Sequence, residues 1–216
     1  MNLARRIGLG ACLLLPLGVS ASRAAADAEH MGQQVDYMDA QSAFDSSAGC
    51  ISTHVDVSVG DSYTHNTAGP PVSDASAYFN FLVTDRCTPG SIKRYGTTLS
   101  FPYAADLSKK LEGASVTFDQ VAAGVECTQV GSRFTCVDRS FAIAITVDWE
   151  PAGDIVTNEG KSHDRAENYV GHSHFIYSER PAIARLIGSI DGEDVELTDT
   201  AARLSYSKFT ASYVNL

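Results

Sequence analysis

The stretch SFAIAITVDWE, residues 140–150, decides the fold class of this chain. Its odd positions share a large apolar side chain: Phe141, Ile143, Ile145, Val147 and Trp149. Its even positions are small, polar or acidic, so hydrophobicity changes with a period of two. That period is typical of a β-strand, and β-branched and aromatic residues suit the buried face of a sheet. We therefore predict a central core strand at these residues.

Alternation of the same kind recurs along most of the chain. It is found at residues 51–59, 75–87, 91–100, 111–121, 182–190, 193–197 and 202–214. Turn residues separate these segments, and Asp191-Gly192 is a dipeptide that favours a tight hairpin. Helical periodicity is scarce, whereas residues 151–171 are polar and predict a long loop. Roughly eight to ten short strands indicate an all-β class.

We expect a disulfide-stapled antiparallel β-sandwich, with a closed barrel as the alternative. The likeness to immunoglobulin domains is restricted to general architecture, because Trp149, the sole tryptophan, follows all the cysteines beyond residue 26. Residues 27–49 are polar, with scattered apolar positions, and predict an N-terminal arm outside the domain. The β-sandwich domain is expected to span residues 50–216.

The first 26 residues have the pattern of a secretory signal peptide. Arg5 and Arg6 precede an apolar run at residues 7–21, and small residues at 24–26 suit cleavage. We therefore expect a secreted, extracytoplasmic protein, in a compartment that permits disulfides.

Charge narrows the range of partners. Loss of three arginines with the signal peptide, from 16 basic residues, would leave 13 against 26 acidic residues. A surface of this sign repels phosphate backbones and anionic lipid. We expect no nucleic acid and no membrane insertion, and a partner that is an unidentified protein or small ligand.

Four cysteines remain after residue 26, and we interpret them as two disulfides. Cys127 and Cys136 flank a short segment with Gly131 near its middle, so a hairpin would join their sulfurs. Cys50 opens one predicted strand and Cys87 ends the next, which favours their pairing in an antiparallel hairpin. Because these two lie on opposite parities, this pair requires a bulge or a frayed strand end.

Histidines gather in one segment of the sequence. His163, His172 and His174 lie within twelve residues, and an extended backbone places His172 and His174 on one face. Such spacing suits a single zinc or copper ion, and a solvated polar loop is the alternative. A pH-sensitive loop is a third interpretation, because histidines near acids titrate close to neutrality.

A resemblance to small exported bacterial β-proteins of unknown activity covers residues 50–204. The stretches that carry it are 85–88 (DRCT), Gly96, 163–165 (HDR), 172–174 (HSH) and 180–182 (RPA). The resemblance implies no catalytic residue. It implies a shared histidine- and arginine-containing segment, in which Arg165 or Arg180 pairs with Glu167 or Glu179 to fix a long loop.

The sequence thus favours a non-catalytic binding or surface module, although it does not settle whether the chain is an enzyme. The expected contact region lies within residues 151–180, because loops on a rigid sheet scaffold commonly carry recognition. The binding loop is represented by Asp164, Arg165, Glu167 and Arg180. The alternative function is a metal-binding protein or metal-dependent enzyme centred on the three histidines, with zinc or copper as its cofactor; otherwise no cofactor is expected.

Overall fold

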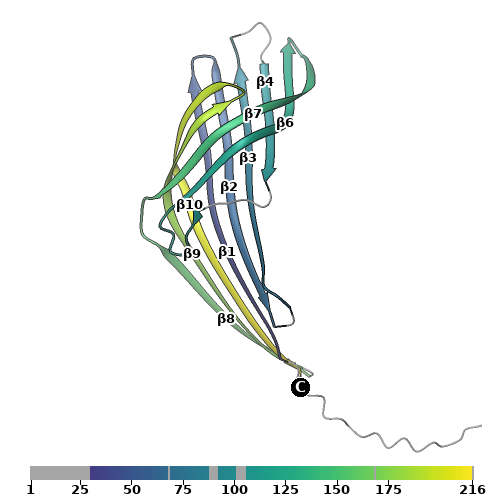
Figure 1. Cartoon of the computed structure of the whole chain (residues 1–216), viewed down its shortest axis with the longest axis vertical. Coiled ribbons are helices and arrows are strands. Elements are labelled where there is room, and N and C mark those ends of the chain that lie inside the picture. Colours follow the sequence, from purple (N-terminus) through teal and green to yellow (C-terminus); the bar gives the residue numbers. More distant parts are fainter. Residues whose placement is uncertain (1–29, 68, 88–91, 101–105, 168, 216) are drawn as a thin grey trace, which may run out of the picture.

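The computed structural model describes residues 30–67, 69–87, 92–100, 106–167 and 169–215, all of which belong to β-strands or to the turns between them (Figure 1). The predicted signal peptide, residues 1–26, lies outside the described residues. Within the described part of the chain, no helix is long and apolar enough to cross a membrane.

Most of the strands are long, and most consecutive ones pair as antiparallel hairpins. In chain order they are β1 (His30–Ala48), β2 (Ile51–Asn66), β3 (Val72–Asp85), β4 (Ile92–Ser100), β5 (Asp106–Leu107), β6 (Ala114–Val130), β7 (Arg133–Pro151), β8 (Val156–Ala166), β9 (Tyr169–Ile190) and β10 (Glu193–Asn215). The exceptions to pairing in chain order are β4, which pairs with β6, and β7, which pairs with β9.

All these strands belong to one antiparallel sheet whose order returns to its start. The sheet runs β10-β1-β2-β3-β4-β6-β7-β9, and β9 pairs again with β10, while β8 adds to β9 and β5 to β6. The all-β antiparallel prediction is confirmed, but the two-sheet sandwich is not, because the sheet is ring-like. A period of two is the same in both architectures, since it reports one buried face and not which strands pair.

The prediction that residues 27–49 form an N-terminal arm outside the domain is also corrected, because residues 30–48 are a strand of the sheet. Residues 30–48 form β1, in which residues 33–48 pair with β2 on one side and residues 30–41 pair with β10 on the other. Phe44 and Ala40 of β1 are fully buried, whereas Gln34 and Asp36 continue the same face with polar side chains. The mixture of polar and apolar inward residues hides the alternation, and β1 is the strand that closes the sheet.

Alternate side chains fill the interior where the sheet is closed. The largest fully buried ones include Trp149, Phe44, Phe79, Phe81, Phe118 and Phe141. The rings of Phe81 and Phe141 meet edge to face at 5.2 Å. Gly96 makes room for them, because a β-carbon there would lie 2.4 Å from the Phe81 ring. The core strand predicted at residues 140–150 is therefore part of β7 and is confirmed.

In the lower half of the molecule in Figure 1, β9 pairs with β8 instead of β7. Its C-terminal part pairs with β7, and its N-terminal part, residues 169–179, pairs with β8. We call β8, together with residues 169–180, 203–215, 30–41, 60–66 and 72–76, the lower sheet. Its inner face continues the buried face of the core, and its outer face is the opposite one. The long loop predicted at residues 151–171 is thus mainly the β8–β9 hairpin.

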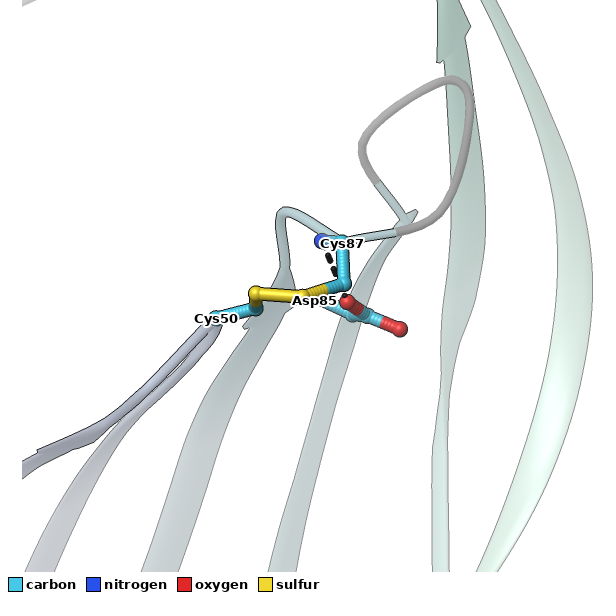
Figure 2. Close-up of a disulfide and its surroundings, with 3 residues drawn as sticks. All are labelled: Cys50, Asp85 and Cys87. Atoms are coloured by element: carbon cyan, nitrogen blue, oxygen red, sulfur yellow. Dashed lines mark hydrogen bonds between the residues drawn. A yellow bond between two sulfur atoms is a disulfide. The ribbon is translucent and has the colours of Figure 1, made fainter.

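Both predicted disulfides are present. Cys127 and Cys136 are direct partners in the β6–β7 register, with α-carbons 4.0 Å apart. Cys50 and Cys87 lie just beyond the paired ends of β2 and β3, with α-carbons 5.2 Å apart. The Cys87 amide donates to Asp85 Oδ1 at 2.8 Å (Figure 2). Since both cysteines lie outside the ladder, their opposite parity presents no obstacle.

Candidate functional site

Two of the three predicted metal ligands meet on the inner face of the lower sheet. His163 of β8 and His172 of β9 are direct cross-strand partners. Their Nδ1 atoms lie 3.0 Å apart and their ring centroids 4.4 Å apart. Residues that lie directly opposite each other in an antiparallel pair have close β-carbons. This is why the rings of His163 and His172 are in contact although the residues are nine positions apart in the sequence. Both side chains belong to exposed residues.

His174 lies on the same face but has another partner. Its Nε2 lies 2.8 Å from Glu159 Oε1, which also receives Lys161 Nζ at 2.9 Å. The hydrogen bond from Lys161, followed by that from His174, lowers the pKa of the exposed Glu159 carboxyl. A shallow pocket of about 290 Å³ is lined in part by Lys161, His172 and His174. Among the described residues, no group of three or more His, Cys, Asp or Glu side chains is arranged to hold a metal.

The predicted binding loop is divided between two places. Asp164, Arg165 and Glu167 are exposed at the end of the β8–β9 hairpin, where Asp164 accepts a 3.4 Å hydrogen bond from Ser162. Arg180 is half-buried instead, and donates to the carbonyl of Gly153 at 2.8 Å and to that of Leu111 at 3.2 Å.

Arg180 therefore holds the backbone at Gly153 and at Leu111 by hydrogen bonds. This role differs from the ion pair with Glu167 or Glu179 that the resemblance implied. The guanidinium that approaches Glu179 belongs to Arg203 of β10, at 3.9 Å. Arg180 follows Glu179 directly along β9, so the two side chains point to opposite faces of the sheet.

A second group of side chains, which the sequence analysis did not identify, lies on the outer face of the lower sheet. Three strands bring it together in adjacent rows: Asp39 of β1 is opposite Ser205 of β10, which is opposite Glu179 of β9. We call the following residues the outer cluster: Tyr37, Asp39, Gln41, Tyr177, Glu179 and Arg203. Tyr37, Asp39 and Gln41 occupy alternate positions, which is a signal for one face of a strand. The prediction of an N-terminal arm at residues 27–49 left this signal unused.

Asp39 has the most unusual environment of the outer cluster. It is 7% exposed although it lies on the outward face, and its Oδ1 has no hydrogen-bond partner. Opposite it on β2 is Gly60, and Tyr37 covers that position, because a β-carbon on Gly60 would lie 2.7 Å from Tyr37 Oη. Burial raises the pKa of Asp39 to about 6, although a hydrogen bond from Gln41 and the charge of Arg203 lower it.

Two tyrosines of the outer cluster, Tyr37 and Tyr177, lie close enough to Asp39 to respond to its charge. Tyr37 is 41% exposed and Phe175 is 43% exposed. Burial, and then the charge of Asp39, raise the pKa of Tyr37. Tyr177 donates a hydrogen bond to Glu179, which raises the pKa of Tyr177, and its ring is nearly parallel to that of Phe175, with centroids 6.5 Å apart. The arrangement combines a desolvated acceptor with exposed aromatic surface.

A contrasting carboxyl lies on the inner face, below the core. Asp36 is 3% exposed and accepts from Tyr206 at 2.8 Å, from Gln34 at 2.9 Å and from Lys109 at 3.0 Å. Burial alone would raise the pKa of Asp36, but the three hydrogen bonds outweigh it and the pKa is lowered. Both Asp36 oxygens are occupied, so this group closes the lower end of the core as a structural hub.

Comparisons with known proteins do not place the chain in a family. No model of a known protein family matches it, and no curated protein matches it in sequence. Among solved structures, it is similar to the beta domain of the Bordetella autotransporter Brka, at 10% identity over 86% of this chain and 98% of that chain. The TM-score is 0.15, and a likeness this weak carries no argument about fold or function.

Proposed function

We propose that this protein is an extracytoplasmic, non-catalytic binding module that uses the outer cluster to recognise a basic side chain of a protein partner. One observation carries the proposal: Asp39 is 7% exposed, yet its Oδ1 has no hydrogen-bond partner. A buried acceptor without a donor costs roughly 1–3 kcal/mol. A lysine or arginine side chain docked over Asp39 would supply the missing donor and a compensating charge.

The surroundings of Asp39 support a cationic partner of this kind. Tyrosine is enriched among residues that dominate binding energies, and Tyr37 lies close enough to Asp39 for the charge of Asp39 to raise the pKa of Tyr37. Tyr37 also offers an exposed aromatic face, which attracts cations through its quadrupole. Glu179 adds a second carboxyl in the same row. A basic side chain would therefore find aromatic contact and two acceptors together.

The charge of the whole chain favours the same partner class. The chain has 26 acidic and 16 basic residues, so its field attracts positively charged surfaces and raises the rate of encounter. The two disulfides are consistent with an oxidising compartment outside the cytoplasm.

The position of the outer cluster also suits recognition. Tyr37 and Asp39 stand on β1, which is paired on both sides, and Glu179 stands on β9, which is likewise paired on both sides. Side chains on such strands are held more precisely than side chains on loops. We therefore expect a partner to bind with little movement of the backbone.

Calorimetry with a tetralysine peptide at 0.15 M salt tests the proposal. Asp39→Asn is expected to weaken binding by at least about tenfold, since it removes the buried charge that the peptide neutralises. Asp119→Asn is the matched control, because Asp119 is exposed on β6 and its loss changes the net charge equally. Tetraglutamate is expected not to bind.

Proton release gives a second readout that unspecific attraction would not produce. At pH 6 about half of the Asp39 carboxyls are protonated, so a bound cation should release up to about half a proton per peptide. Asp39→Asn should abolish this release. Equal weakening by Asp119→Asn and Asp39→Asn, or unchanged binding in both, would contradict the proposal.

A further inference from the structure

We propose that His163 and His172 form a two-imidazole copper(II) site on the inner face of the lower sheet. This site is separate from the outer cluster, which lies on the opposite face. The two imidazoles come from adjacent strands, and their Nδ1 atoms are already 3.0 Å apart. The β8–β9 ladder holds the two residues opposite each other without requiring a loop to close.

The type of ligand indicates the class of metal. Imidazole nitrogen suits zinc(II), copper(II) and nickel(II), and copper(II) binds nitrogen ligands most tightly in the divalent series. Copper(II) also prefers square-planar or tetragonal sites, in which two imidazoles leave positions for water.

The hydrogen bond between the two rings does not oppose metal binding. One Nδ1 donates to the other, so one ring carries its proton on Nδ1. A shift of that proton to Nε2 of the same ring leaves a neutral imidazole and frees the second Nδ1 lone pair. Both rings are exposed, so a rotation of each about its side-chain torsions can direct the lone pairs to one point.

His174 lies on the same face but outside the proposed pair. Glu159 holds its Nε2 at 2.8 Å, and the three histidines together are not arranged as a metal group among the described residues. His172 and His174 line the same pocket of about 290 Å³. The charge of Lys161, which also lines it, is matched by the same Glu159 at 2.9 Å.

Copper(II) titration of the full chain without a histidine tag, followed by electron paramagnetic resonance, tests the site. We expect one copper per chain, in a tetragonal spectrum with hyperfine coupling to two nitrogens. His163→Ala and His172→Ala should each weaken binding at least about tenfold, whereas His174→Ala should leave both nitrogen couplings in place. His163→Asn and His172→Asn, which retain hydrogen bonding across the strand pair, should weaken binding equally.

His54→Ala is the matched control, because His54 of β2 is held by Asp45 of β1 and Asp56 of β2, outside the β8–β9 hairpin. It should leave copper binding within about twofold. Zinc(II) is expected to bind at least about tenfold more weakly than copper(II). Copper binding that survives both His163→Ala and His172→Ala, or zinc binding as tight as that of copper, would overturn the site.

Discussion

Replacing Asp39 by asparagine should make the protein more stable at neutral pH, and the gain should depend on pH. The carboxyl is 7% exposed, and burial raises its pKa from 3.8 to about 6. One pKa unit corresponds to about 1.4 kcal/mol, so ionised Asp39 costs the folded state about 3 kcal/mol. Asparagine has nearly the same shape, carries no charge and replaces one carboxylate oxygen with an amide nitrogen, while its carbonyl oxygen still accepts a hydrogen bond.

The sign follows from the direction of the pKa shift. Because the pKa of Asp39 is higher in the folded than in the unfolded chain, the stability that its protonation provides is complete below about pH 3.8. That stability is lost as the pH rises through about 6. Asp39→Asn should therefore match the wild type near pH 4 and exceed its free energy of unfolding by about 1–3 kcal/mol at pH 7.5.

Urea unfolding at both pH values, with the disulfides intact, measures this difference. Trp149, the sole tryptophan, is 2% exposed in the core and reports unfolding by fluorescence. Asp119→Asn, at an exposed position, should change stability by less than about 0.5 kcal/mol at either pH. A variant that is less stable than the wild type at pH 7.5, or a difference that is the same at both pH values, would refute the reasoning.

Three further changes test other parts of the fold by the same unfolding measurement. Asp36→Asn should lower the free energy of unfolding by roughly 1–3 kcal/mol at pH 7. Because folding lowers the pKa of Asp36, this loss should shrink as the pH falls through the lowered pKa, and a loss that does not depend on pH would contradict the argument. Gly96→Ala should lower the free energy of unfolding by about 1–3 kcal/mol, because the added β-carbon overpacks the interior. Gly160→Ala, whose β-carbon meets open space, should lower it by less than about 1 kcal/mol. Equal losses would show that the interior has room at residue 96. Removing the Cys50–Cys87 disulfide should destabilise the protein by about 3.8 kcal/mol, and removing Cys127–Cys136 by about 2.6 kcal/mol. The first loss is larger because that disulfide closes a loop of 37 residues instead of 9 and so restricts the unfolded chain more. The opposite order would contradict this argument.

The parts of the fold that could be predicted were those where burial is one-sided and local. In β7, odd residues from Phe141 to Trp149 are buried and even residues are not, so its sequence indicates its structure directly. The Cys127–Cys136 bridge was predictable because a hairpin fixes its partners within nine residues.

Other features depend on contacts that are distant in the sequence. Closure of the sheet requires β1 to pair with β10, which lies more than 160 residues away along the chain, and no period within β1 reports that pairing. β8 is exposed at every residue, so it lacks the alternation of a half-buried strand and resembles a loop in sequence.

The candidate sites divide in the same way. His163 and His172 were selected because they share one segment, and their contact follows from the hairpin register. The outer cluster joins Asp39, Glu179 and Arg203, which three separated strands bring together. Chemistry of that kind could be recognised only after the strand order was known.

The change of neighbour along β9 also bears on how molecules of this protein avoid one another. Among the described strands, β8 pairs only with β9, and residues 72–76 of β3 pair only with β2, so backbone donors and acceptors remain unused along both borders. Such borders invite fibre-like stacking between copies. Lys161, Asp164 and Arg165 stand on β8, where a stacked copy would have to bury their charges. Neutral replacements of these charged side chains should therefore promote association between copies at high protein concentration.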